Sequence, residues 1–312
     1  MAIISASRRT DIPAFFADWF MNRIREGHFH RINPYNTGQS REFSLATEDV
    51  DAIVFWSKNP RPLMKHLDEL DRRGYRYYFQ FTLNPYGPDF EPHLPEPAER
   101  LATFGELAAR IGANKVVWRY DPVILSSETP VDWHLERLSA MAQELSGKTE
   151  RLMFSFLDFY GSVNRRLTEL ERSRGIRLFD LAAADRREEM LSFAAGLKRI
   201  AGNNGMEVFS CAEREDFREA GIGHGSCIDG ALIRGLFGSD RVFARDRNQR
   251  QECLCAVSVD MGMYNTCSFR CVYCYANRRE KMIPSNLAHH SPRSASIVNC
   301  HAGQKIAGKR QG

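Results

Sequence analysis

Residues 256–277 read AVSVDMGMYNTCSFRCVYCYAN, in which a short apolar stretch runs directly into three closely spaced cysteines. Cys267, Cys271 and Cys274 follow the pattern C-x3-C-x2-C, and Tyr273 stands immediately before the last of them. Cysteine thiolates ligate [4Fe–4S] clusters, so three thiolates on one tight loop can hold three of the four irons. Because the loop supplies no fourth cysteine, the pattern predicts a cluster with one iron open to a small ligand.

The order of a strand followed by a chemically distinctive turn recurs along the whole chain. Seven stretches are predicted strands: 2–5, 51–57, 75–83, 115–120, 151–157, 207–211 and 256–260. Helical periodicity fills most of the intervals, at 13–26, 62–72, 97–111, 132–145, 164–201 and 228–237. Strands that alternate with helices predict an α/β fold with a parallel sheet, here a (β/α) TIM-like barrel, full or partial.

Composition is consistent with one large domain. The chain has 312 residues, of which 43% are hydrophobic, and no Pro/Gly/Ser-rich linker divides it. We therefore predict a barrel over residues 1–280, followed by a basic tail over 281–312 that is disordered or only loosely docked. No apolar run reaches the roughly 18 residues of a membrane span, and no signal-peptide pattern opens the chain, so we expect a cytoplasmic protein without a membrane partner.

The cysteine loop resembles the cluster loop of the radical S-adenosylmethionine (SAM) superfamily, including the aromatic residue before the third cysteine. The resemblance implies that SAM chelates the open iron and is reductively cleaved to a 5′-deoxyadenosyl radical, which abstracts hydrogen from an unidentified substrate. It also implies a flavodoxin- or ferredoxin-like reductant. Superfamily members usually carry this loop near the N-terminus, after the first barrel strand, whereas here it lies in the last sixth of the chain.

The late position of the loop has a topological explanation. A barrel is circular, so the strand that carries the cluster can come last in the sequence and still lie beside the first strand. The chain then resembles a circularly permuted radical SAM barrel. This hypothesis predicts that strand 256–260 lies next to strand 2–5, and that the turn over residues 7–11 lies close to the cysteine loop.

A second resemblance covers roughly residues 1–280. The segments IISASRRTDIP, FWSKNP, FQFTLNPYG, WRYDP, SCAE and YCYAN are similar to a bacterial family of unknown function, DUF1848. That family carries a C-terminal cysteine cluster similar to the radical SAM one. The resemblance implies no particular substrate.

Polar residues that end the predicted strands are candidates to bind SAM or the substrate, because barrel chemistry lies at the carboxyl ends of the strands. They are Arg8, Arg9, Asp11, Gln80, Asn84, Arg119, Asp121 and Glu213. Arginine suits the SAM carboxylate through bidentate hydrogen bonds. The inward-facing amides suit a ligand or water network, because buried polar groups are costly when unsatisfied.

Several of these residues also have a purely structural explanation. Asp11 can cap the following helix, and the arginines after the first strand can form ion pairs at the rim. Arg119 and Asp121 can pair with each other, and Glu213 can cap a helix. The sequence leaves both possibilities open for these residues.

Four further cysteines, Cys211, Cys227, Cys253 and Cys255, form a second set. They can hold a second iron–sulfur cluster or a zinc ion, or they can be small buried apolar residues. All eight cysteines follow residue 210, and in a reducing compartment such a set indicates metal or redox chemistry more than disulfides. Cys300 is taken as incidental.

Two alternative functions remain open at this point. The first is a barrel protein with a structural zinc site, in which Cys253 or Cys255 adds the fourth ligand to the loop. The second is a nucleic-acid-acting radical SAM lyase, which the aromatic-rich strand ends and the basic tail permit. The net charge of +4 gives nucleic-acid binding no positive support and does not exclude it.

Overall fold

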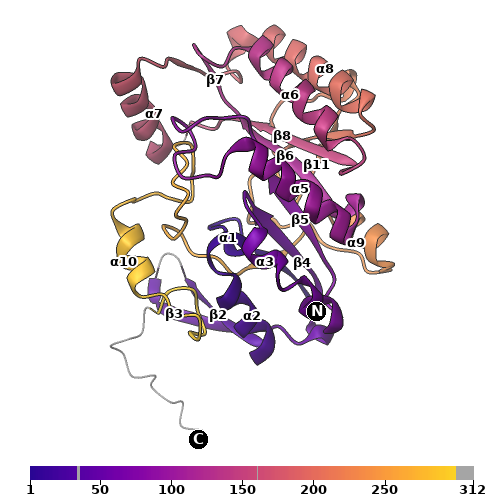
Figure 1. The fold of residues 1–312 in the computed structure, drawn as a ribbon, viewed down its shortest axis with the longest axis vertical. Coiled ribbons are helices and arrows are strands. Elements are labelled where there is room, and N and C mark those ends of the chain that lie inside the picture. The colour runs from indigo at the N-terminus through magenta and orange to yellow at the C-terminus, as the bar shows by residue number, and fades with distance from the viewer. Residues whose placement is uncertain (34–35, 160, 300–312) are drawn as a thin grey trace, which may run out of the picture.

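The computed structural model describes residues 1–33, 36–159 and 161–299. Its centre is an eight-stranded sheet in the order β11-β10-β8-β6-β5-β4-β1-β12, with every neighbouring pair parallel (Figure 1). The strands are β1 (Ala2–Ala6), β4 (Val50–Ser57), β5 (Tyr77–Thr82), β6 (Val116–Val123), β8 (Arg151–Phe156), β10 (Glu207–Cys211), β11 (Gly223–Gly225) and β12 (Ser258–Asp260). All seven predicted strands are therefore present, and β11 is an additional one.

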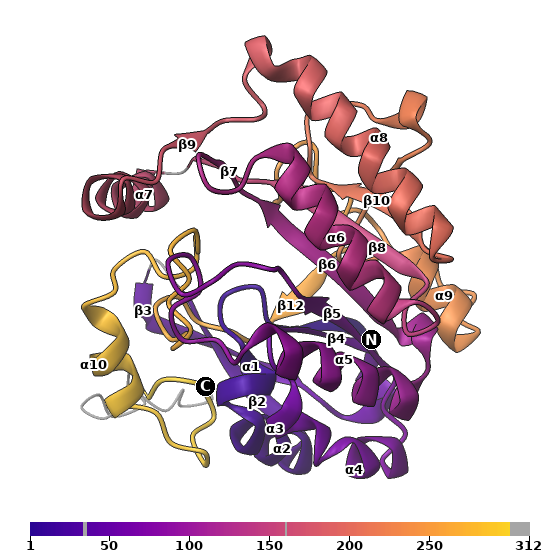
Figure 2. The ribbon, with the colours of Figure 1, turned by 45° about the horizontal axis from the view of Figure 1, so that its top comes forward.

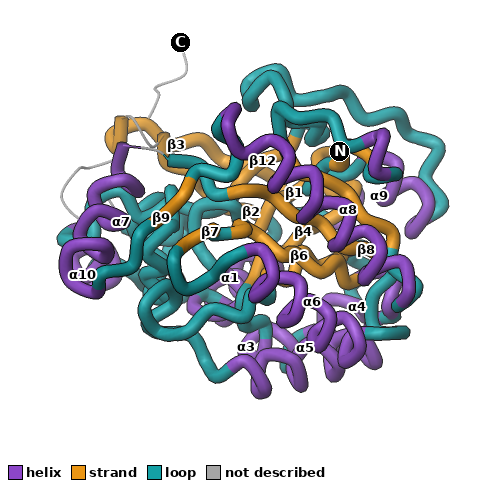
Figure 3. The backbone as a smooth tube through the Cα atoms, turned by 90° about the horizontal axis from the view of Figure 1, so that it is seen from above, coloured by secondary structure: helices purple, strands orange, loops and turns teal. Residues whose placement is uncertain are grey.

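Helices lie around the sheet (Figures 2 and 3). They are α1 (Ile12–Phe15), α2 (Ala17–Glu26), α3 (Arg61–Met64), α4 (Leu67–Arg72), α5 (Pro97–Ile111), α6 (Val131–Leu145), α7 (Gly161–Arg174), α8 (Arg187–Asn203), α9 (Gly230–Phe237) and α10 (Met282–Ala288). The predicted helix over 13–26 divides at Phe16, whose φ of −132° is not helical. Within the described ranges, no helix has the length and apolar character needed to cross a membrane.

Short strands outside the main sheet complete the secondary structure. A hairpin of β2 (His28–Asn33) and β3 (Asn36–Ser44) follows α2. β7 (Leu125–Ser126) pairs with β9 (Leu178–Phe179), which separates α7 from α8. The helical stretch predicted over 164–201 is thus two helices with a strand between them.

Strand order follows the chain without reversal, and the last strand returns to the first. Ile3 pairs with Ser258 and Ser5 with Asp260, so the predicted neighbourhood of the first and last strands is confirmed. β11 and β12 remain the two edges of the sheet, although the amide of Ala256 donates to the carbonyl of Ile228 at 2.9 Å between the segments that flank them. The fold is a mixed α/β fold on a parallel sheet, compatible with a TIM-like arrangement.

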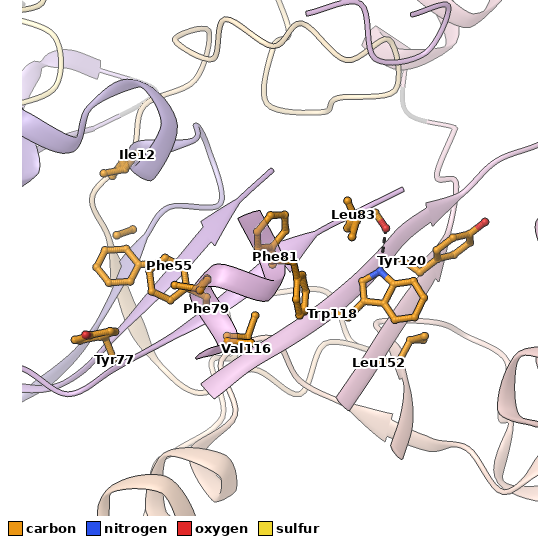
Figure 4. Packing of buried hydrophobic residues seen from close by; sticks show 14 of the residues in the cluster. Ile12, Phe55, Tyr77, Phe79, Phe81, Leu83, Val116, Trp118, Tyr120 and Leu152 are labelled. Atoms are coloured by element: carbon orange, nitrogen blue, oxygen red, sulfur yellow. Dashed lines mark hydrogen bonds between the residues drawn. The ribbon is translucent and has the colours of Figure 1, made fainter. Parts of the chain in front are cut away.

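The two faces of β5 carry different side chains, as the period of two predicts. Tyr77, Phe79 and Phe81 belong to the main apolar core beneath the helices, and the Phe79 ring stacks on Phe55 with centroids 4.8 Å apart (Figure 4). Gln80 lies on the opposite face, where its amide donates to the carbonyl of Cys227 at 2.8 Å. Gln80 therefore shares its face of the sheet with a second, smaller apolar cluster that includes Val54, Tyr78 and Val117.

The C-terminal segment differs from the predicted tail. Residues 281–299 contain α10 and pack on the N-terminal third of the chain, where the Trp19 indole donates to the carbonyl of Ser294 at 2.8 Å. Ile283, Ile297 and Val298 are buried. These apolar residues are too scattered for a periodic pattern, which is why the sequence suggested disorder. The remainder of the predicted tail, 300–312, lies outside the described residues.

A buried histidine in the core gives a first prediction. The ring of His134 accepts a hydrogen bond from the Tyr120 hydroxyl at 2.8 Å and donates one to the carbonyl of Ile124 at 2.8 Å. Burial lowers the pKa of His134 to about 4. An unfolded histidine titrates near 6.5, so between these values only the unfolded state binds the proton, and stability falls as the pH falls.

We expect His134→Gln to remove this pH dependence. Between pH 7 and pH 5 the wild-type free energy of unfolding should fall by about 2 kcal/mol more than that of the variant. Urea unfolding of both proteins at the two pH values measures the difference. Parallel losses in the two proteins would show that His134 is not kept neutral by the fold.

Candidate functional site

A cavity of about 410 Å³ lies at the carboxyl ends of the strands. Its walls come from the turn after β1, the ends of β4, β5, β6, β8 and β10, the loop after β11, and the cysteine loop. All seven cysteines in the described part of the chain line it: Cys211, Cys227, Cys253, Cys255, Cys267, Cys271 and Cys274. Both cysteine sets therefore meet in one cavity whose size is typical of small-molecule sites.

The predicted cofactor-binding residues divide into two groups. Arg8, Asp11, Arg119 and Asp121 line the cavity, whereas Arg9, Gln80, Asn84 and Glu213 lie outside its lining. The Arg9 guanidinium stacks over the Tyr264 ring at 5.1 Å, and the Glu213 carboxylate accepts a hydrogen bond from the Phe156 amide at 2.8 Å. Burial raises the pKa of Glu213 to about 7. Asn84 and Gln80 contact residues that line the cavity: Asn84 donates to the Tyr273 hydroxyl, and Gln80 donates to the carbonyl of Cys227.

Asp11 joins the turn after β1 to the end of β4. Its carboxylate accepts from the Ala14 amide at 3.0 Å, which confirms the predicted helix cap. It also accepts from the Ser57 hydroxyl at 2.8 Å and the Lys58 amide at 2.7 Å. Burial raises the pKa of Asp11 to about 7 despite these bonds. The predicted structural role is present, and the same side chain faces the cavity beside Cys267.

Asp260, at the end of β12, holds the turn after β1 against the start of the cysteine loop. Its carboxylate accepts four hydrogen bonds, from the Ser5 hydroxyl (3.0 Å), the Ser7 hydroxyl (2.7 Å), the Arg8 amide (2.9 Å) and the Gly262 amide (2.8 Å). A Cβ on Gly262 would lie 1.8 Å from the Ser7 hydroxyl oxygen, so glycine is required there. This junction places residues 7–11 next to the cysteine loop, as the permuted topology predicts.

Backbone carbonyls of the cysteine loop are held by Arg166 of α7. Its guanidinium donates to the carbonyls of Val272 (2.7 Å), Asn277 (2.7 Å) and Cys274. The amide side chain of Asn277 donates to the carbonyl of Cys267 at 2.9 Å, so the loop is bound at both ends. The loop is thereby shaped without using the cysteine sulfurs, which stay available as ligands.

The spacing of the loop sulfurs differs from that of a single-ion site. Among the residues that the structure describes, the one group of three candidate ligands with all atoms within 4.8 Å is His28, His30 and Glu42, on the β2–β3 hairpin. Thiolates around one zinc, each about 2.3 Å from the ion, would lie about 3.8 Å apart. In a [4Fe–4S] cluster each thiolate binds a different iron, which separates the sulfurs further. The three loop sulfurs are thus not gathered around a single point at the spacing of a zinc site.

A buried ionic network supports the aromatic residue of the loop. The Tyr273 hydroxyl donates to the Glu91 carboxylate and accepts from the Lys58 ammonium at 2.7 Å. Glu91 also forms ion pairs with Lys58 at 2.8 Å and Arg100 at 3.2 Å. Asn84 donates to the Tyr273 hydroxyl at 3.3 Å. Lys58 and Tyr273 are the members of this network that line the cavity.

Arg119 connects the sheet interior to the second set of cysteines. Its guanidinium pairs with Asp121, which is the structural alternative that the sequence left open. Asp121 also accepts a hydrogen bond from the Ser155 hydroxyl at 2.5 Å. The same guanidinium donates to the Cys227 sulfur at 2.8 Å and lies 3.8 Å from that of Cys211. Arg119 is almost completely buried, so its charge acts at short range on these thiols.

Sequence reasoning missed three residues that organise the site. Asp260 ends a predicted strand, and that position was a usable signal. Glu91 lies in a loop and Arg166 on a helix, far in sequence from the residues that they hold, and no local pattern distinguishes either. Lys58 directly follows β4 but is not among the residues that the sequence predicts to bind SAM or the substrate. Cys300 lies outside the described residues.

We expect Arg166→Ala to loosen the cysteine loop. Loss of three charge-assisted hydrogen bonds should lower the free energy of unfolding by about 1–3 kcal/mol and speed amide hydrogen exchange in peptides covering residues 261–277. Arg166→Lys should recover only part of the effect, because one ammonium cannot reach three carbonyls as a guanidinium does. Arg165→Ala, on the exposed side of the same helix, is the control. Equal exchange in both alanine variants would contradict the role given to Arg166.

Comparison with known proteins gives one finding. A family model described as a domain of unknown function, DUF1848, matches residues 3–276. No curated protein and no solved structure matches the chain.

Proposed function

Because the chain belongs to the DUF1848 family, whose description assigns no function, we propose from the site that it is a radical SAM enzyme acting on an unidentified substrate. Cys267, Cys271 and Cys274 would ligate a [4Fe–4S] cluster, with SAM in the adjoining cavity. Such a cluster, when bound, supplies the electron that cleaves SAM to methionine and a 5′-deoxyadenosyl radical. A flavodoxin- or ferredoxin-like reductant is the expected electron donor.

The observation that carries the proposal is the placement of the three cysteines. All three line a cavity large enough for a small molecule, on a loop whose sulfurs are not drawn around a single ion. Burial raises the pKa of the Cys271 thiol, so an unligated thiolate would be unfavourable there and a bound metal would have to displace the proton. Three thiol ligands beside an open cavity are what a cluster with a free iron requires.

Residues around the cavity can bind the polar ends of SAM. The Arg8 guanidinium lies over the Trp56 ring at 5.8 Å and lines the cavity, where it can pair with a carboxylate. Lys58 also lines the cavity, although its ammonium already pairs with Glu91 at 2.8 Å. Arg119 and Asp121 already satisfy each other, so we assign them to shaping the cavity more than to holding charge.

We further infer that the sheet corresponds to a circularly permuted radical SAM barrel. The unbroken strand order, with β12 beside β1, supports this relationship. The seven described cysteines are free thiols, in keeping with the cytoplasmic location that we propose.

The test is electron paramagnetic resonance of the anaerobically reconstituted, dithionite-reduced protein with and without SAM, followed by an assay for 5′-deoxyadenosine. We expect a [4Fe–4S]⁺ signal that changes when SAM is added, and 5′-deoxyadenosine formation that Cys271→Ala abolishes. Cys300→Ala is the matched control and should leave both unchanged. Zinc in place of iron, with no 5′-deoxyadenosine, would refute the proposal and favour a structural zinc site.

A further inference from the structure

Four buried thiols lie together at the seam between the two edges of the sheet. Cys211 ends β10, Cys227 follows β11, and Cys253 and Cys255 lie in the segment that leads into β12. Their exposed fractions are between 1% and 8%, and none forms a disulfide. Segments far apart in the sequence thus bring four potential ligands to one place.

The sulfurs form a continuous chain. The sulfurs of Cys211 and Cys227 are 3.0 Å apart, and the Cys255 sulfur lies close enough to those of Cys227 and Cys253 to interact with both. The Ile228 amide also donates to the Cys255 sulfur at 3.4 Å. Polar contacts to these sulfurs come from backbone and arginine donors, which is the surrounding that anionic sulfur ligands need.

From this arrangement we propose that Cys211, Cys227, Cys253 and Cys255 ligate a second iron–sulfur cluster, separate from that of the Cys267–Cys274 loop. Four thiolates are the usual ligand set of a [2Fe–2S] or [4Fe–4S] cluster. The proposal uses different cysteines from the proposed SAM site and does not depend on it.

The shape of the sulfur chain distinguishes a cluster from a single zinc ion. Around one zinc all the sulfurs would lie about 3.8 Å from one another. Within the described residues, no three of these sulfurs are all within 4.8 Å of each other. A chain that is close at each link and longer end to end suits a [2Fe–2S] cluster, in which each of the two irons takes two of the four thiolates.

Charge around the four thiols supports an anionic centre. Arg119 donates to Cys227 at 2.8 Å, and Arg8 approaches Cys227 and Cys255 closely enough to interact with both electrostatically. Asp121 pairs with Arg119, and the Asp260 carboxylate lies near Arg8 without forming a salt bridge with its guanidinium. An iron–sulfur cluster with four thiolate ligands carries net negative charge, which the buried Arg119 and the half-buried Arg8 would balance.

A cluster bound by the four thiols would also affect the structure of the sheet. The amide of Ala256 donates to the carbonyl of Ile228 at 2.9 Å, and the cluster ligands flank this bond on both sides. Metal bound by all four cysteines would join the edge that contains β11 to the edge that contains β12. Loss of the metal should therefore loosen residues 223–229 and 253–260 together.

The experiment uses the full-length variant C267A/C271A/C274A, which lacks the loop ligands, reconstituted anaerobically with ferrous iron and sulfide. We expect about two to four iron atoms per chain with equal inorganic sulfide, and a visible absorbance that dithionite bleaches. Adding C211A/C227A should abolish both iron and sulfide, and C253S/C255S should do the same by a second route. Cys300→Ser in the same background is the control.

Several outcomes would overturn the proposal. These are an iron-free loop variant, bound zinc without sulfide, a Cys211–Cys227 disulfide without metal, or iron that survives loss of Cys211 and Cys227. Circular dichroism of each variant checks folding, and hydrogen exchange with and without iron reports whether residues 223–229 and 253–260 tighten on metal binding. A cluster in the loop variant together with no SAM cleavage by wild type would uphold this inference and reject the proposed enzyme.

Discussion

Asp260→Ala is expected to lower the free energy of unfolding by about 3–5 kcal/mol, one of the two largest single-residue effects on stability that we predict. The carboxylate accepts four hydrogen bonds and is 6% exposed. The hydroxyls of Ser5 and Ser7 can rotate toward other acceptors, but the amides of Arg8 and Gly262 cannot. Their desolvation without a partner dominates the expected loss.

Urea unfolding of Asp260→Ala and of Asp240→Ala measures this effect. Asp240 is exposed, and its replacement should change stability by no more than about 0.5 kcal/mol. Asp260→Asn keeps one acceptor oxygen and should fall between the two. We also expect Asp260→Ala to retain less iron after reconstitution, because the start of the cysteine loop is then no longer fixed to β1. A stability loss equal to that of Asp240→Ala would remove Asp260 from the junction.

The pattern of apolar residues and turns in the sequence is sufficient to predict most of the sheet. Apolar stretches bounded by turns locate seven of its strands, and α5 was predicted with its observed bounds because Pro97 begins it and Gly112, at a φ of 96°, ends it. β11 was missed because Gly223, His224 and Gly225 carry almost no apolar surface. Pairing with β10 makes it a strand, and that information is not local.

In the candidate site, too, local sequence patterns predict some features, whereas others depend on contacts between distant elements. Cysteine spacing identifies the loop because its three cysteines are neighbours in the sequence, and the hypothesis of a circular strand order predicts the neighbourhood of β1 and β12, which is observed. Arg166 reaches carbonyls more than a hundred residues away, and Glu91 meets Tyr273 across 182 positions. Such partners depend on how whole elements pack, so a single sequence contains no periodic signal for them.

Convergence at the carboxyl ends of the strands was predictable, but the division of labour among the polar residues was not. Arg9 and Glu213 lie outside the cavity lining, whereas Lys58 lines the cavity and forms an ion pair with the buried carboxylate of Glu91. Position at a strand end predicts where a side chain begins. Where it points depends on partners that other elements supply.

Glu91→Ala is expected to lower the free energy of unfolding by about 3–5 kcal/mol at pH 7, because it leaves buried cations without a partner. Arg100 and Glu91 have side chains only 1% exposed, and that of Lys58 is 15% exposed. Burial alone would raise the pKa of Glu91, but the charges of Lys58 and Arg100 lower it below its usual value. The carboxylate is therefore ionised at pH 7.

Two comparisons make the Glu91 prediction specific. Glu144→Ala, on the exposed face of α6, should change stability by no more than about 0.5 kcal/mol. Glu91→Met combined with Arg100→Met should be more stable than Glu91→Ala, since the double variant removes a buried charge as well as its partner.

The pH dependence of the Glu91 contribution to stability follows from its lowered pKa. The Glu91 contribution should be complete above the unfolded value of about 4.5 and be lost only as the pH falls through the lower folded value. The cost of Glu91→Ala should thus be the same at pH 7 and pH 5, where the His134 contribution already declines. A cost that shrinks between these two pH values would mean that Glu91 is protonated in the folded protein and that Lys58 is not held by an ion pair.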